Sequence, residues 1–95
     1  MPSEAEFLNV RYFAAARAAA GVDEEQFDLP AGATVASLLE AVLAVHRPEP
    51  PAGTPPLPRI LSRSSFLLNE VAVRDRSVAL GPEDVVDVLP PFAGG

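Results

Sequence analysis

The groups best suited to chemistry lie in the last six residues of the sequence: Pro90, Pro91, Phe92, Ala93, Gly94 and Gly95. Six extended residues reach about 20 Å at roughly 3.3 Å each, and the two prolines stiffen the base of this tail. Glycine has no Cβ, so the Gly94-Gly95 end can enter a channel too narrow for any other residue. The reactive group that such a tail delivers is the α-carboxylate of Gly95.

A carboxylate at this position needs activation before it can react. Its reference pKa is about 3.5, so it is ionised at neutral pH and is a poor acyl donor. Adenylation by a partner that uses ATP is one way to activate it. The alternative is that Gly94-Gly95 is only a frayed end, because chain termini are commonly disordered. Phe92 favours a functional tail that binds a partner over one that packs back on the domain. A phenylalanine in a projecting tail has little core to join, and exposed aromatic residues often anchor partners.

Composition excludes most other kinds of site. The 95 residues contain no cysteine, which rules out a disulfide framework, a thiolate zinc site and a cysteine nucleophile. The single histidine, His46, is interpreted as a helix cap, Arg17 as a structural tether, and the pair Glu83-Asp84 as solvated turn residues. We therefore expect no catalytic side chain, no metal site and no cofactor.

Net charge and hydropathy limit the partners. Seven arginines, no lysines and thirteen acidic residues give a formal charge of -6, which disfavours nucleic acid as a partner. The charge is interpreted mainly as an aid to solubility, with a basic partner surface as the alternative. Residues 1–6 carry acid where a signal peptide would carry base, and no apolar run is long enough to span a bilayer. We expect a cytoplasmic protein without a membrane partner.

Two helices are predicted. Residues 34–46 begin with a favourable N-cap, and their apolar residues recur at helical spacing: Val35, Leu38, Leu39, Val42 and Leu43. His46 and Arg47 are placed in the last turn of this helix, and Pro48 ends it. A shorter helix is predicted at residues 14–20, where alanine is nearly continuous and Gly21 can close the helix.

The remaining pattern predicts strands around one proline-rich loop between Pro48 and Pro58. In the first strand, alternation places Leu8, Val10 and Tyr12 on one face. The strands are expected at residues 7–13, 25–29, 66–69, 71–74 and 85–89, with a turn at Asn69-Glu70. This order predicts an α+β protein in which a mixed sheet of four to five strands carries one main helix on one face.

Two stretches resemble a known family. Residues 10–21 (VRYFAAARAAAG) are similar to the pattern F-A-x-x-R-x-x-x-G that follows its first strand. Residues 80–95 (LGPEDVVDVLPPFAGG) are similar to L-x-x-G-D-x-V followed by apolar residues and P-P-x-x-G-G. The chain thus resembles the small subunit of molybdopterin synthase, one of the ubiquitin-like β-grasp sulfur carriers that also include the thiamine-pathway carrier. It departs from the pattern at Glu83, where the family usually has glycine, and its loop at residues 48–58 is longer.

The resemblance implies a role as substrate and co-subunit. An E1-like enzyme that uses ATP would adenylate Gly95, and sulfur would then replace one oxygen to give a thiocarboxylate. Pro91, Phe92, Ala93 and Gly94 would insert into the large subunit of molybdopterin synthase, where the sulfur is donated to a pterin. On this interpretation residues 1–89 are a single β-grasp domain, residues 90–95 are the functional tail, and the active site belongs to the large subunit.

Alternatives remain open at this level. A carrier of the same chemistry could serve thiamine, cysteine or tRNA sulfuration, because the fold and the Gly-Gly end are shared. A ubiquitin-like binding module without a functional tail is the alternative from a different class. In a β-grasp sheet the first and last strands are neighbours, so Phe13 and Leu89 are predicted to form an apolar docking patch beside the tail. The alternative for Phe13 is that it packs under the alanine helix.

Overall fold

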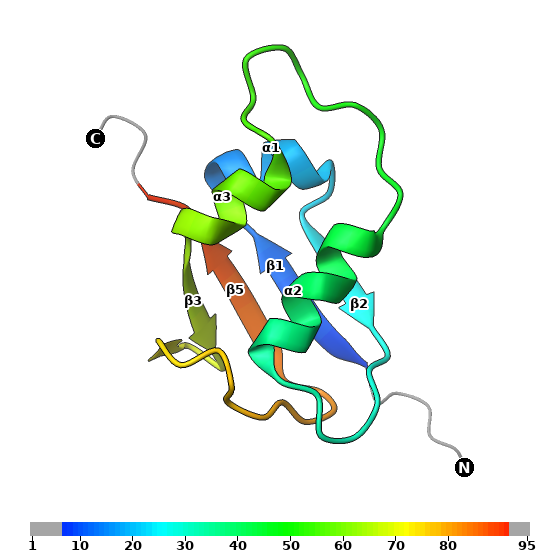
Figure 1. The fold of residues 1–95 in the computed structure, drawn as a ribbon, viewed down its shortest axis with the longest axis vertical. Helices are drawn as coiled ribbons and strands as arrows, with labels where there is room; N and C mark the ends of the chain where they lie inside the picture. The colour runs from blue at the N-terminus through cyan, green and yellow to red at the C-terminus, as the bar shows by residue number, and fades with distance from the viewer. Residues whose placement is uncertain (1–6, 92–95) are drawn as a thin grey trace.

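A five-stranded mixed sheet forms the framework of the protein in the computed structural model, which describes residues 7–91 (Figure 1). The strands are β1 (Leu8–Tyr12), β2 (Glu24–Phe27), β3 (Ser65–Leu68), β4 (Val71–Val73) and β5 (Val85–Leu89). Their spatial order is β2-β1-β5-β3-β4. β1 and β5 are parallel and every other pair is antiparallel. The first and last strands are therefore neighbours, as predicted.

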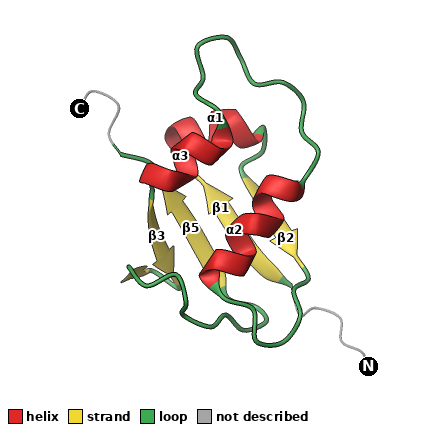
Figure 2. Cartoon of the chain, viewed as in Figure 1, coloured by secondary structure: helices red, strands yellow, loops and turns green. Residues whose placement is uncertain are grey.

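Three helices cover one face of this sheet and leave the other face open (Figure 2). They are α1 (Ala14–Ala20), α2 (Val35–Ala44) and α3 (Leu57–Arg63). The core lies between the layers, and the sheet contributes to it the side chains Leu8, Val10, Tyr12, Phe66, Val86 and Val88. None of the helices in the described part of the chain has the length and apolar character needed to span a bilayer.

α2 follows the predicted pattern closely because its first turn is capped locally. The Thr34 hydroxyl accepts from the Ser37 N–H at 3.2 Å, and the Ser37 hydroxyl accepts from the Thr34 N–H at 3.2 Å. Each bond satisfies a backbone donor that the helix itself leaves free. The buried residues are Val35, Leu38, Leu39 and Val42, as predicted, whereas Leu43 is 44% exposed and the prediction for it was wrong.

α3 is a helix that sequence reasoning missed. The segment after Pro48 was interpreted as loop as far as Pro58, but Pro58 lies in the first turn of α3. Proline is tolerated there because the first-turn N–H groups have no partner within the helix. Leu57, Ile60 and Leu61 then extend the core at helical spacing. The long loop of residues 45–56 connects α2 to α3 and projects from the domain (Figure 1).

Two predicted turns form where the backbone takes a left-handed conformation. Gly21 ends α1 with φ 84°, and its N–H bonds to the carbonyl of Arg17. Asn69 and Glu70 have φ values of 50° and 72°, the combination required by the two-residue turn of a tight hairpin. The β3–β4 hairpin is therefore confirmed.

Candidate functional site at the base of the tail

The tail begins where β5 ends, at the centre of the sheet. Tyr12 pairs with Val88 in the β1–β5 ladder, and Leu89 pairs with Ser65 in the β3–β5 ladder. Proline has no N–H with which to continue a ladder, so pairing stops after Leu89, and Pro91 is exposed. Two neighbouring strands thus determine the point at which the chain leaves the domain.

Most of the predicted tail lies outside the described residues. Pro91 is the one member of the predicted insertion segment for which the structure gives a position. Phe92, Ala93, Gly94 and the predicted reactive Gly95 lie beyond it. Their roles stay predictions.

Phe13 and Leu89 lie beside the base of the tail. Both directly follow the last pair of the β1–β5 ladder, Tyr12 with Val88. Phe13 is 41% exposed and Leu89 is half-buried. The exposure of Phe13 argues against the alternative in which it packs under α1. Whether the two side chains bind a partner stays a prediction.

An ion pair crosses the open face between the two central strands. Arg11 Nε donates to Asp87 Oδ1 at 2.6 Å, and its Nη2 donates to Oδ2 at 2.9 Å. Hydrogen bonding to Asp87, together with its negative charge, raises the pKa of Arg11. The Asp87 side chain is only 6% exposed, although it lies opposite the helices. The pair explains how an acidic residue is accommodated in a central strand.

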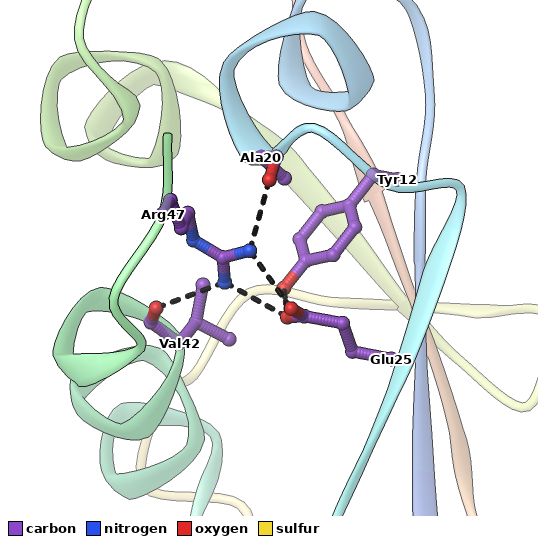
Figure 3. Close-up of polar contacts among 5 residues, drawn as sticks. All are labelled: Tyr12, Ala20, Glu25, Val42 and Arg47. Carbon is purple, nitrogen blue, oxygen red and sulfur yellow. Dashed lines mark hydrogen bonds and ion pairs between the residues drawn. The ribbon is translucent and has the colours of Figure 1, made fainter. Parts of the chain in front are cut away.

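Arg47 is the side chain that sequence reasoning placed most wrongly. Its predicted position was the last turn of a helix ending at residue 46, but α2 ends at Ala44 and Arg47 turns inward (Figure 3). Its Nη1 donates to the Ala20 carbonyl at 3.0 Å, and its Nη2 donates to the Val42 carbonyl at 3.0 Å. The same two nitrogens contact the Glu25 carboxylate at 2.8 Å each. Arg47 therefore joins the ends of α1 and α2 to β2.

Tyr12 completes this cluster from β1. Its hydroxyl donates to Glu25 Oε1 at 2.8 Å, and burial raises the pKa of Tyr12 above its usual value. Burial also acts to raise the pKa of Glu25, but hydrogen bonds from Arg47 and Tyr12 outweigh it, so the pKa of Glu25 is lowered. The cluster lies on the helix-covered side of the sheet and is structural. A sequence signal for it existed, since alternation places Glu25 on the same face as Phe27, and a buried carboxylate requires a cation.

The turn before β5 accommodates Glu83 at the position where the family pattern has glycine. Glu83 has φ 70°, a conformation that favours glycine. Asp84 Oδ2 accepts from the Gly81 N–H at 2.7 Å, and its Oδ1 accepts from the Asn69 amide at 3.0 Å. The turn is therefore held by Asp84, and its backbone keeps the shape that a glycine at position 83 would take without strain.

Comparisons with known proteins agree with this geometry. The model of the ThiS family matches residues 10–95. The chain belongs to the ThiS family. A relative from Chlamydomonas reinhardtii, a molybdopterin synthase sulfur carrier subunit, is 36% identical over 89 residues, which cover 93% of this chain and 98% of the relative. The resemblance drawn from the two motifs is confirmed.

Solved structures agree on the fold of this ThiS family member. The crystal structure of SAMP1 from Haloferax volcanii has a TM-score of 0.73 at 22% identity, covering 94% of this chain and 99% of that one. A candidate molybdopterin converting factor, subunit 1, from Pyrococcus furiosus has a TM-score of 0.68 at 28% identity, covering 90% of this chain and 98% of that one. The fold is a ubiquitin-like β-grasp, as predicted.

Proposed function

We propose that this protein is a sulfur carrier for molybdopterin biosynthesis and the small subunit of a molybdopterin synthase. The observation that carries the proposal is the match, over nearly the whole length of both chains, to a molybdopterin synthase sulfur carrier subunit. The fold supports it, because β5 is held on both sides and directs the chain out of the domain at Pro90-Pro91. A fixed base suits a tail that enters another protein.

The proposed chemistry takes place at the carboxylate of Gly95. One of its oxygens attacks the α-phosphate of ATP in an E1-like enzyme, pyrophosphate leaves, and an acyl adenylate forms. A donor that delivers sulfur at the sulfide level then displaces AMP, and the carrier ends in a thiocarboxylate. The anionic sulfur is a better nucleophile than a carboxylate oxygen, as thiolates are, and it attacks the pterin substrate in the large subunit. Water then cleaves the bond between this sulfur and the Gly95 carbonyl carbon, so the sulfur stays on the pterin and the carrier is released with its carboxylate restored.

The domain itself contributes position and contact in this scheme. Residues 1–89 present the tail, and residues 90–95 carry the reactive group, with Pro91, Phe92, Ala93 and Gly94 inside the partner. Phe13 and Leu89 are proposed to dock against the partner, and the exposure of Phe13 supports this. Catalytic groups and ATP belong to the partners. The expected cytoplasmic location stays a prediction.

The decisive experiment is intact-mass measurement after incubation with the activating enzyme, ATP and a sulfur donor. We expect the mass change of one oxygen exchanged for sulfur, and none without ATP. A variant with alanine added after Gly95, or with Gly95 deleted, should fold normally and remain unloaded, while alanine added before Met1 provides the matched control. Loading of the extended variant at the normal rate would contradict the mechanism.

A carrier for another sulfuration pathway is the second candidate, because the family whose model matches the chain, ThiS, specifies no pathway by its description. Both candidates require the thiocarboxylate, so mass measurement does not separate them. Adding the loaded protein to a molybdopterin synthase large subunit with its pterin substrate does. Product formation supports the first candidate, and loading without product supports the second. Binding that survives deletion of Gly94-Gly95, with no loading at all, would instead indicate a docking module.

A further inference from the structure

The arginines of this acidic protein are unevenly distributed. Three of the seven are paired, Arg11 with Asp87, Arg17 with Asp23 and Arg47 with Glu25. The other four are exposed and form no ion pair within residues 7–91: Arg59, Arg63, Arg74 and Arg76. We call these four residues the arginine surface.

The arginine surface lies where α3 leads into β3. Arg59 and Arg63 are one turn apart on the exposed side of α3, whose other side is in the core. Arg74 and Arg76 follow β4, which is antiparallel to β3. The guanidinium of Arg76 contacts the Leu61 carbonyl at 3.5 Å and lies 5.2 Å from the centre of the Phe66 ring. These contacts tie the segment after β4 to α3.

A shallow groove lies beside two of these arginines, Arg74 and Arg76, and reaches the base of the tail. Ser64, Ser65, Phe66, Ala72, Val73, Arg74 and Arg76 line it. Ser65 is also the residue that pairs with Leu89, the last residue of β5. Figure 1 shows the chain leaving β5 beside α3. The groove and the base of the tail are therefore close enough for one partner to contact both.

The acidic residue between two of these arginines, Asp75, forms no ion pair with them. Asp75 lies between Arg74 and Arg76 in the sequence, but its Oδ1 accepts from the Ser77 hydroxyl at 2.6 Å and from the Ser77 N–H at 2.9 Å. Those bonds lower the pKa of Asp75 and orient its carboxylate toward Ser77. The guanidinium groups of Arg59, Arg63 and Arg74 form no ion pair within residues 7–91 and stay available to an outside acceptor, whereas Arg76 is partly engaged by the Leu61 carbonyl.

We propose that the arginine surface is an electrostatic docking site for an acidic surface on the protein that takes up the tail. Arginine matches carboxylates with a rigid fork of donors, and it is enriched at protein interfaces. The charge of -6 on the whole chain repels a polyanion, which favours a folded acidic partner over nucleic acid. Complementary charge beside the tail would orient the carrier during encounter and raise the association rate. The inference rests on the proposed function, because it assumes a partner that holds the tail.

The test compares two variants of equal net charge. Arg63→Gln with Arg74→Gln removes two charges from the arginine surface and spares Arg76, which contacts the core. Gln26→Glu with Ala52→Glu makes the same change of net charge at exposed positions on β2 and in the loop of residues 45–56. Melting temperatures of both variants establish that each one folds. Association rates with the large synthase subunit are then measured at low and high salt.

We expect the arginine variant to associate roughly tenfold more slowly than wild type at low salt, with a weaker salt dependence. The control variant should stay within about twofold of wild type. Equal rates for the two variants overturn the inference and leave the proposed function intact. Failure of wild type to bind the large subunit overturns both. If the arginine variant loses binding to a single-stranded RNA oligonucleotide and binds the subunit normally, the surface is a nucleic-acid site and the inference is wrong.

Discussion

Arg47 and Glu25 lie 22 residues apart in sequence and meet through two parallel hydrogen bonds of 2.8 Å each. Their side chains are only 11% and 18% exposed. The pair links the start of the long loop after α2 to β2, and through Tyr12 to the central strand β1 (Figure 3). Through its bonds to the Ala20 and Val42 carbonyls and to Glu25, Arg47 links two helices to the sheet within the described part of the chain.

Replacing Arg47 with methionine should lower the free energy of unfolding by roughly 3 kcal/mol, because Glu25 is then left buried without its cation. Arg47→Lys should lose most of the same stability, since one ammonium cannot replace the fork and both carbonyl contacts. Urea denaturation measures the change. Arg59→Met, at an exposed arginine without an ion pair among the described residues, is the control and should cost little. If Arg47→Met and Arg59→Met lower the free energy of unfolding equally, the ion pair between Arg47 and Glu25 does not stabilise the fold as argued.

Stability should fall in acid because of Glu25. The pKa of its folded form is lowered, so between the folded and unfolded pKa values the unfolded chain binds more protons. The contribution is complete above the ordinary glutamate pKa of 4.5 and is lost as pH falls through the folded value. Urea midpoints at about pH 6 and about pH 3.5 should therefore differ more for wild type than for Glu25→Gln. Asp75, whose pKa is also lowered, is present in both proteins, so its contribution to the acid loss of stability cancels in the comparison. An equal acid loss in the two proteins would contradict this assignment.

Leu39→Ala should reduce stability by roughly 2–5 kcal/mol, because the residue is 7% exposed and its removal leaves a cavity beneath α2. Leu43→Ala is the matched control on the same helix. Leu43 is 44% exposed, and its truncation should cost less than about 1 kcal/mol. Thermal melting distinguishes the two. If the costs are reversed, the assigned face of α2 is wrong.

Glu83→Gly should stabilise the domain by about 0.5–1 kcal/mol, because glycine adopts the left-handed backbone without the penalty that a Cβ brings. Glu83→Ala removes the same side chain but keeps the Cβ, so it should bring no such gain. Denaturation of the three proteins under one set of conditions provides the comparison. A glycine variant less stable than the alanine variant would mean that this turn is not strained.

Phe13→Ala and Leu89→Ala should weaken binding to the large subunit or to the activating enzyme, with small changes in melting temperature. Phe13 is 41% exposed and contributes little to the core, so its truncation is the sharper test. Val71→Ala, at a 67% exposed apolar residue on the edge strand β4, is a control away from the proposed patch. Affinity measured by calorimetry should drop for the first two variants and stay unchanged for the third. Normal affinity combined with a large loss of stability would identify Phe13 and Leu89 as core residues.

The sequence by itself determined the features that depend on neighbouring residues. The N-cap at Thr34, the left-handed Gly21 after an alanine helix, the two-residue turn at Asn69-Glu70 and the stop at Pro90 all follow from local sterics and hydrogen bonding. Period-two alternation likewise identified Leu8, Val10 and Tyr12 as the buried face of β1. The family motifs at residues 10–21 and 80–95 added the β-grasp topology through the resemblance they carry, and the structure pairs β1 with β5 accordingly.

Only the tertiary structure decided which groups from distant segments meet. Arg47 was expected at a helix end on the surface, and it turns inward and is half-buried because a carboxylate from β2, not the helix dipole, offers it the stronger partner. α3 was hidden because prolines dominate the sequence before it, while its apolar residues gain stability only when packed into the core beside α1 and α2. The arginine surface also depends on the β3–β4 hairpin, which brings the segment of Arg74 beside that of Arg63. Net charge can be read from composition, but the position of each charge follows from strand pairing.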